Sequence, residues 1–461
     1  MRLSRIACSA SLVFLLAPAL WPTDGRAESA PQQSPASSPG AQSTGAPAQA
    51  PGTSVPPQAF ETKETQGYTL SPDKYHKAVA YSRSLYMLYF VSFAYGLFVL
   101  LLVLKLGVAT RFRDFAEGLT DRRWVQAMVF VPLLILTIAV VRLPTSIYGH
   151  SLSLRYEQSV QGWGSWLWDW TKGEFIVVAL STPFVVILFA VIRKSPRRWW
   201  LYFWMVAYPI LILIVFGSPW IIDPLFNKFE PLDARHPELV TAIEQVVGRA
   251  GLTIPRERMF LMQASLKTNQ LNAYVTGLGA SKRVVVWDTT IQKTTTPETL
   301  FVFGHEMGHY VLGHVRGGLI FFAILLFAVF FVGFHLLHWA LDRWGRAWNI
   351  RGPEDWASLP LMLLLLSFTL FFCMPIVSGF TRTQEHNADV YGLEVIHGLV
   401  PNSADVAAHA FQVLGEVDLA DPNPPAFIEF WLYSHPPLAD RLVFARTYDP
   451  WSKGESPKYI K

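Results

Sequence analysis

The amino-acid sequence predicts a predominantly α-helical, polytopic membrane protein that carries a small β element. Of its 461 residues, 51% are hydrophobic and only 16% are charged, an apolar excess that soluble domains do not show. Six apolar stretches each approach the roughly 20 residues that a helix needs to cross the hydrocarbon. The net charge of +4 is modest, and its cations gather between these stretches. We therefore expect the lipid bilayer, and no nucleic acid, as a partner of this protein.

The order of the apolar stretches assigns each connection to a side of the membrane. Connections rich in Lys and Arg favour the cytoplasm, and three of them alternate correctly to share it: 105–123, 193–198 and 342–356. This alternation leaves 142–173 and the long region 218–317 outside. The expected spans themselves are 85–104, 124–141, 175–192, 199–216, 319–341 and 357–376.

The N-terminal segment has the composition of an export signal. Arg2 and Arg5 precede an apolar run that ends near Leu20, and small residues follow. We expect residues 1–27 to form a signal peptide or, alternatively, an uncleaved signal anchor. Residues 28–67 are rich in Pro, Ser, Ala and Gln. Such a composition cannot bury a core, so a disordered linker is expected there.

Polar segments divide the remainder of the chain into four parts. We expect transmembrane helices 1–4 in 68–217, a soluble subdomain in 218–317, a transmembrane hairpin in 318–377 and a C-terminal polar subdomain in 378–461. The first soluble part contains "HPELVTAIEQVVGRAGL", which predicts an amphipathic helix, and "RVVVWD", which predicts a strand. A further helix is expected to begin at the N-cap Thr296, since Pro297 would then occupy its first position.

That helix carries His305-Glu306-x-x-His309, the zincin motif. Residues four apart on a helix differ by about 40°, so both imidazoles face one way and can share one Zn²⁺. Glu306 lies beside them without being a ligand, as a general base requires. Cys8 and Cys373 fall in the targeting segment and in an expected span. Any metal must therefore be held by His, Glu or Asp.

A third ligand must come from outside this motif. His314 lies nine residues after His305, which is roughly 180° around a continuous helix. We therefore expect His314 to face away from the metal and to serve as scaffold. The helix would then pass into the next span at Gly317-Gly318.

The segment "TRTQEHNADVYG" (381–392) offers the missing donors. Glu385 and Asp389 are four apart and share one helical face. Glu385 would then ligate the metal, while Asp389 accepts a hydrogen bond from a ligand histidine and sets its tautomer. His386, on the neighbouring face, is a rival ligand, and spacing alone does not choose between them.

Five segments, in order, resemble the motifs of the CAAX prenyl protease type 1 family, integral-membrane zinc metalloproteases whose eukaryotic members process prenylated precursors. They are "SPWIIDPLFNKFEPL" (218–232), "LNAYVTGLGASKRVVVWDTTI" (271–291), "FGHEMGHYVLGH" (303–314), "TRTQEHNAD" (381–389) and "YSHPPLADRL" (433–442). The resemblance covers about residue 71 to the C-terminus. It implies helices around an intramembrane chamber and a zincin-like catalytic domain. It also implies seven spans. The sequence provides six, and the N-terminal apolar run would supply a seventh only if it is not cleaved.

The resemblance also implies roles for single residues. Glu385 is implied to be the third ligand, and His435 is implied to stabilise the tetrahedral oxyanion. Asn272, in the strand before the zincin helix, is implied to lie along the substrate-binding edge, where a strand could bind a peptide by extending the sheet. The roles of Tyr274 and Arg441 are left undecided.

We therefore expect a zinc-dependent membrane endopeptidase that hydrolyses peptide bonds in peptides or membrane-associated proteins. A non-enzymatic membrane chaperone, or a substrate-binding pseudoprotease on the same fold, is the alternative, and the intact Glu306 argues against it. The export signal and the charge pattern favour a bacterial inner membrane with the catalytic domain facing the periplasm. The physiological substrate, the need for prenylation and the oligomeric state are left open.

Overall fold

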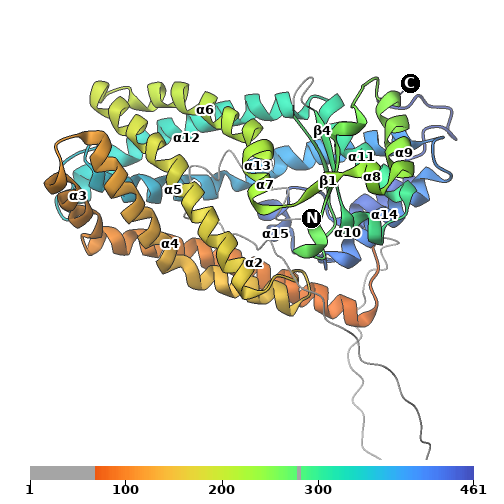
Figure 1. The fold of residues 1–461 in the computed structure, drawn as a ribbon, viewed down its shortest axis with the longest axis horizontal. Helices are drawn as coiled ribbons and strands as arrows, with labels where there is room; N and C mark the ends of the chain where they lie inside the picture. Colours follow the sequence, from red (N-terminus) through yellow and green to blue (C-terminus); the bar gives the residue numbers. More distant parts are fainter. Residues whose placement is uncertain (1–67, 278–281, 461) are drawn as a thin grey trace, which may run out of the picture.

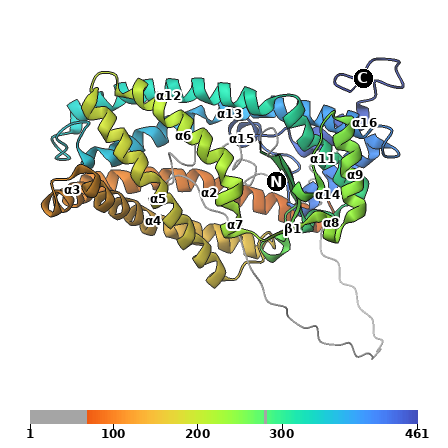
Figure 2. The ribbon, with the colours of Figure 1, turned by 45° about the horizontal axis from the view of Figure 1, so that its top comes forward.

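The computed structural model describes residues 68–277 and 282–460. The expected signal segment 1–27 and linker 28–67 lie outside the described residues. Within them the chain is mostly helical and has one small sheet, as the sequence predicts. Figures 1 and 2 show long helices running along the longest axis of the molecule, with the sheet and most of the shorter helices toward one end.

Six of the described helices are long and apolar enough to cross a membrane, which confirms the six expected spans. They are α2 (Pro72–Lys105), α4 (Arg123–Arg155), α5 (Trp163–Lys194), α6 (Trp199–Ile221), α12 (His314–Trp344) and α13 (Leu359–Ile396). Each is longer than its apolar stretch, because hydropathy marks only the segment that lies in the hydrocarbon. Backbone-breaking residues set the ends of some of these helices. In α2, for example, Pro72 occupies the first turn and Gly107, at φ 63°, follows the last.

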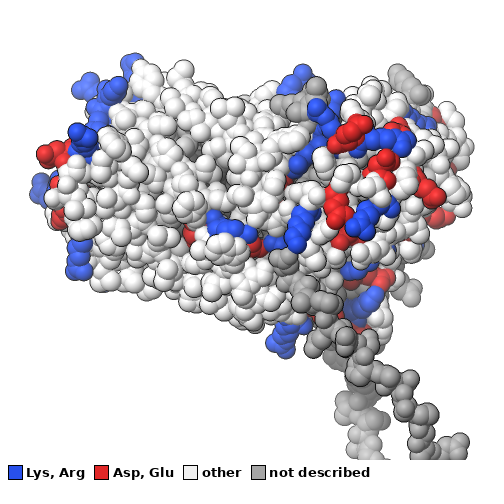
Figure 3. All heavy atoms as spheres, in the orientation of Figure 1, with Lys and Arg blue, Asp and Glu red and all other residues white. Residues whose placement is uncertain are grey.

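The surface of this bundle is suited to lipid. Figure 3 shows a broad band without charged side chains across the long helices, with charges at both ends of the molecule. Large apolar side chains are exposed on these helices, among them Phe98, Met128, Leu213, Ile324 and Phe372. A continuous exposed apolar surface of this kind marks a membrane contact.

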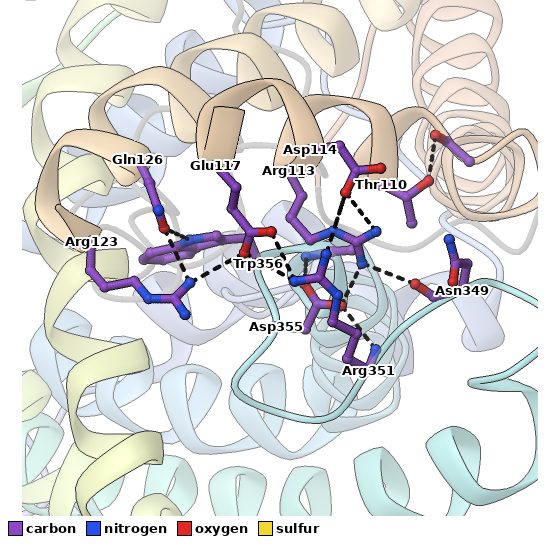
Figure 4. Close-up of polar contacts among 12 residues, drawn as sticks. Thr110, Arg113, Asp114, Glu117, Arg123, Gln126, Asn349, Arg351, Asp355 and Trp356 are labelled. Atoms are coloured by element: carbon purple, nitrogen blue, oxygen red, sulfur yellow. Dashed lines mark hydrogen bonds and ion pairs between the residues drawn. The ribbon is translucent and has the colours of Figure 1, made fainter. Parts of the chain in front are cut away.

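The three basic connections meet at the end of the bundle far from the sheet (Figures 1 and 3). Helix α3 (Val108–Leu119) lies in the first of them. There the buried guanidinium of Arg113 binds Asp355 of the third connection at 2.7 Å, within the network of ion pairs in Figure 4. Arg193, at the start of the second connection, lies over the Trp356 ring at 5.7 Å. The structure thus confirms one part of the expected alternation, namely that the three basic connections lie on the same side of the bundle.

The connection expected at 142–173 is mostly helical, because α4 continues to Arg155 and α5 begins at Trp163. The short turn between them contacts the soluble part. The hydroxyl of Thr268 donates to the carbonyl oxygen of Gln158 at 2.8 Å. This turn therefore lies at the sheet end of the bundle, opposite the basic connections.

One four-stranded sheet is the centre of the soluble part. Its strands are β1 (Phe229–Pro231), β2 (Met259–Met262), β3 (Ala273–Thr276) and β4 (Arg283–Trp287). The order is β1-β2-β4-β3; β2 and β4 pair in parallel, and the other neighbours pair antiparallel. Every residue of β4 is buried, as its continuous apolar run requires in an inner strand. Strand β3 is left at an edge of the sheet.

Shorter helices pack around this sheet and around the end of α13. They are α7 (Asp223–Phe226), α8 (Leu232–Arg235), α9 (Pro237–Arg249), α10 (Asp288–Lys293), α11 (Thr296–Val311), α14 (Ser403–Val417), α15 (Ala426–Leu432) and α16 (Leu438–Thr447). Ile243, Phe301, Val395 and Phe411 of four different helices share one buried core. The domain boundary predicted after residue 377 falls inside α13, which runs unbroken from the bundle into this core.

Helices α11 and α13 approach each other at backbone distance. A Cβ added to Gly392 would lie 2.8 Å from the His305 nitrogen, and one added to Gly304 would lie 3.2 Å from the Gly392 oxygen. One turn further along, a Cβ on Gly308 would meet the Ala388 Cα at 3.2 Å. Small residues four apart on both helices thus remove the side chains that would separate them.

We predict that Gly392→Ala pushes α11 away from α13, because the added methyl group meets backbone rather than a movable side chain. Overpacking of this kind costs about 1–3 kcal/mol, so the midpoint of thermal unfolding of the full chain should fall. Gly248→Ala in α9 is the control, since a Cβ there meets nothing within 4 Å. Its midpoint should stay level or rise, because alanine favours a helix by about 0.5–1 kcal/mol. An unchanged midpoint for Gly392→Ala would contradict the close-packing argument.

Candidate metal centre

Helix α11 begins with a capping box. The side chain of Thr295 accepts from the backbone of Glu298, and the Glu298 carboxylate accepts from the Thr295 nitrogen at 2.8 Å. The prediction of Thr296 as the N-cap was wrong by one residue. The box requires the glutamate three positions after the cap, and only Thr295 satisfies that spacing. Pro297 consequently occupies the second helical position rather than the first, which the sequence had predicted.

His305 and His309 of α11 and Glu385 of α13 face one point. The Nε2 atoms of the two histidines lie 3.2 Å apart. Glu385 places Oε2 at 3.1 Å from His305 Nε2 and Oε1 at 3.5 Å from His309 Nε2. One potential ligand atom from each residue lies within 4.8 Å of the others. The structure thus brings together the three residues that the sequence assigned to a metal, and two imidazoles with one carboxylate are suitable ligands for such an ion.

The rival ligand His386 lies elsewhere. Its side chain is exposed, and its ring packs against Phe444 with the centroids 4.8 Å apart. It is one residue beyond Glu385, about 100° further around α13, so it cannot share the ligand face. Of the two open alternatives, the geometry favours Glu385.

Asp389 lies behind His305, where the sequence placed it. Its Oδ1 is 2.7 Å from His305 Nδ1, so the imidazole donates its Nδ1 proton to the carboxylate and keeps Nε2 free for a metal. Arg441, whose role was undecided from the sequence, binds the same carboxylate with two nitrogens, at 2.8 and 2.5 Å. Asp389 and Arg441 are 0% and 4% exposed. Each therefore neutralises the charge of the other at a place almost entirely removed from water.

The electrostatics of the centre favour positive charge. Burial alone disfavours an imidazolium at His305, but Asp389 and Glu385 outweigh it and raise the pKa of His305. Burial likewise opposes the charge of Arg441, and the attraction of Asp389 outweighs it and raises the pKa of the guanidinium. The negative potential of the two carboxylates therefore exceeds the cost of burying a cation here.

His435 reaches the same cluster from the loop before α16. Its Nε2 lies 2.9 Å from Oε2 of Glu385, and its Nδ1 lies 2.8 Å from the Ser434 hydroxyl. Arg382, one turn before Glu385 on α13, positions this loop by donating to the carbonyl oxygens of Glu429 (2.8 Å) and Tyr433 (2.7 Å). Arg382 was not predicted from the sequence. Its only signal was a spacing of three residues from Glu385 on one helical face.

The prediction that His314 faces away from the site was wrong. Its Nδ1 lies 3.0 Å from His309 Nδ1. The prediction assumed one continuous helix, but α11 ends at Val311, and Gly313 adopts a left-handed conformation at φ 70°. Helix α12 then begins at His314, so the change of helix falls before this residue and not at Gly317-Gly318.

Asn272, which was predicted at the substrate edge, and Tyr274, whose role was undecided from the sequence, lie beside β4. Asn272 immediately precedes β3 and is buried. Its backbone nitrogen donates to the Thr290 hydroxyl at 2.8 Å. The hydroxyl of Tyr274 lies 3.5 Å from an oxygen of Asp223, which gives Tyr274 a contact at the edge of the membrane bundle rather than in the ligand cluster.

The bundle of apolar helices is joined to a sheet domain, where the His-Glu-x-x-His helix meets a carboxylate. This combination defines a multi-pass membrane metalloendopeptidase. Comparisons with known proteins agree. Residues 233–449 match peptidase family M48, and residues 53–228 match the family described as CAAX prenyl protease N-terminal, five membrane helices. This chain belongs to peptidase family M48.

Its relatives extend from bacteria to eukaryotes. The "Uncharacterized metalloprotease YhfN" of Bacillus subtilis is 34% identical over 395 residues, 86% of this chain and 91% of the relative. "CAAX prenyl protease 1" of Saccharomyces cerevisiae is 27% identical over 341 residues, 69% and 71% of the two chains. The crystal structure of S. mikatae Ste24p has the same fold, with a TM-score of 0.69 over 85% of this chain and 91% of that one, at 24% identity. The resemblance to CAAX prenyl proteases is confirmed.

We predict that Arg441→Met destabilises the protein by about 3–5 kcal/mol, because it leaves the Asp389 carboxylate buried without its partner. Thermal unfolding of the full chain measures this loss. Arg235→Met is the matched control, because Arg235 forms an exposed ion pair with Glu230 at 3.1 Å. Removing such a pair costs about 0–1 kcal/mol. Equal losses of stability in the two variants would show that the buried ion pair stabilises the protein no more than an exposed one.

Proposed function

We propose that His305, His309 and Glu385 hold one Zn²⁺ and that this centre hydrolyses peptide bonds. The observation that carries the proposal is the convergence of their three ligand atoms within 4.8 Å. Two imidazoles and a carboxylate form the ligand set of catalytic zinc, with one position left for water. The carboxylate of Asp389 behind His305 supports it further, because zinc-binding histidines commonly donate their second N–H to such a group.

Bound zinc would lower the pKa of water to roughly 7 and polarise the substrate carbonyl. Glu306 follows His305 on α11 and is partly exposed. Its carboxylate takes the proton of the attacking water and then delivers it to the leaving amine. One carboxyl group serves both steps, because the nucleophile and the leaving nitrogen are bonded to the same carbon.

His435 stabilises the oxyanion that develops on the carbonyl oxygen. The Ser434 hydroxyl, 2.8 Å from His435 Nδ1, donates to that nitrogen and leaves the imidazole proton on Nε2. Nε2 faces the cluster, 2.9 Å from Glu385. A neutral imidazole held in this tautomer donates a hydrogen bond toward the reacting carbonyl.

The substrate binds as an added strand along β3. The Trp287 nitrogen donates to the Asn272 oxygen at 3.1 Å. By the alternation of an antiparallel pair, Ala273 and Val275 then direct their peptide groups away from the sheet. An extended peptide would pair with these groups. The Asn272 side-chain oxygen is buried and has no hydrogen-bond partner among the described residues, which supports a substrate contact there.

The site faces the side opposite the basic connections. Because Lys and Arg favour cytoplasmic connections, we place the ligand cluster toward the periplasm of a bacterial inner membrane. The similarity to a metalloprotease of Bacillus subtilis supports a bacterial setting. Peptides or membrane-associated proteins are the substrates that this placement favours.

We predict that Glu306→Gln abolishes cleavage of a fluorogenic peptide library, with a loss of about 10²–10⁴-fold in kcat, while zinc content is retained. The amide keeps the shape of the side chain but cannot accept the proton. A chelator should remove both zinc and activity, and added zinc should restore them. Cleavage that survives both treatments would overturn the proposed function. Binding of the library without cleavage by the wild-type chain would favour the non-enzymatic alternative.

We predict that Val275→Pro weakens substrate binding without affecting zinc, because proline removes an N–H group that faces outward from the edge strand. One lost hydrogen bond of about 0.5–1.5 kcal/mol corresponds to a rise in KM of about 2–10-fold. Val275→Thr keeps the N–H group and a β-branched side chain and should behave as the wild type. A KM that is the same in all three proteins would exclude strand addition at this edge.

A further inference from the structure

We propose that His314 is a positioning residue of the metal centre, which accepts a hydrogen bond from His309 and directs His309 Nε2 to the ion. This inference rests on the proposed zinc function. It assigns a role to a residue that lies outside the His-Glu-x-x-His motif. Its basis is the approach of the two Nδ1 atoms to 3.0 Å.

The two nitrogens of His309 have different surroundings. Nε2 faces His305 Nε2 at 3.2 Å and Glu385 at 3.5 Å, on the ligand side of the ring. Nδ1 faces His314 on the other side. A neutral imidazole that offers Nε2 to a metal carries its proton on Nδ1, and that proton needs an acceptor. Nδ1 of His314 provides one when His314 carries its own proton on Nε2.

The same geometry excludes His314 as a ligand of this ion. A metal in the cluster lies on the Nε2 side of His309, whereas His314 lies on the Nδ1 side. Only His305, His309 and Glu385 form a convergent donor group among the described residues. His314 therefore acts through His309, as Asp389 acts through His305 at 2.7 Å.

The helix break makes this contact possible. On a continuous helix, five residues separate His309 from His314 by roughly 140°. Gly313 at φ 70° ends that continuity, and the ring centroids of the two histidines come to 5.1 Å with the planes 70° apart. Glycine adopts this conformation without steric cost, whereas other residues pay for it.

The choice of an imidazole rather than a carboxylate has a consequence for charge. Glu385 and Asp389 already place two carboxylates at the centre, and Arg441 neutralises only Asp389. A third carboxylate behind His309 would reduce the positive charge that a bound metal presents to water and carbonyl. A neutral imidazole orients the ring and leaves that charge undiminished.

The test compares three variants of the purified full chain. His314→Leu removes the acceptor, and His314→Asn keeps an acceptor oxygen near the position of Nδ1. His338→Leu is the matched control, because His338 lies on the same helix and its Nδ1 contacts the Phe334 carbonyl at 2.8 Å, away from the cluster. Zinc affinity is measured by chelator competition, ligand geometry by the absorption spectrum of the Co²⁺-substituted protein, and folding by thermal unfolding.

We expect His314→Leu to bind zinc about 10–100-fold more weakly than the wild type and to alter the Co²⁺ spectrum. His314→Asn should recover most of the affinity, and His338→Leu should match the wild type. Wild-type affinity in His314→Leu, or equal losses in the Leu and Asn variants, would overturn the positioning role while the zinc function stands. A wild-type chain that takes up no zinc would instead overturn the proposed function itself.

Discussion

The candidate metal centre depends on the direct backbone contact between α11 and α13. Its donors come from two chain segments that a transmembrane hairpin separates, so nothing local holds Glu385 opposite the histidines. Gly304 and Gly308 on one helix meet Ala388 and Gly392 on the other. This contact sets the register, because Asp389 and Glu385 lie about one and two turns before Gly392. A larger residue at the contact would move both carboxylates relative to His305.

A chain of buried polar contacts extends outward from this packing. Arg441 binds Asp389, Asp389 orients His305, and Glu385 meets His305, His309 and His435. Each buried charge has an opposite charge or a hydrogen-bond donor, as its removal from water requires. Because α13 continues from the bundle into the core, one of the six spans carries Glu385 and Asp389 into the ligand cluster. The membrane part is therefore a structural component of the site.

The sequence predicted the local features of this protein and missed most of those that depend on helix continuity. Hydropathy predicts the six spans, and helical periodicity predicts that His305 and His309 share one face. Both signals depend only on neighbouring residues, as does the start of the zincin helix near Thr296. The exact cap was wrong because the capping box begins one residue earlier, at Thr295. The position of His314 was wrong because the left-handed Gly313 ends the helix before it. Arg382 was missed, since its partners are backbone carbonyls that no sequence pattern marks.

The sequence by itself determined the class of chemistry: a His-Glu-x-x-His helix joined to apolar spans, with Glu385 and Asp389 spaced on one helical face. Periodicity made these assignments possible, because it depends only on positions along one helix. Spacing left Glu385 and His386 open, the family resemblance implied Glu385, and the geometry agrees with that choice. Only the tertiary structure paired Arg441 with Asp389 and placed His314 behind His309. Those relations join segments far apart in the chain or depend on a break in a helix. Packing and backbone conformation, rather than spacing, fix their distances.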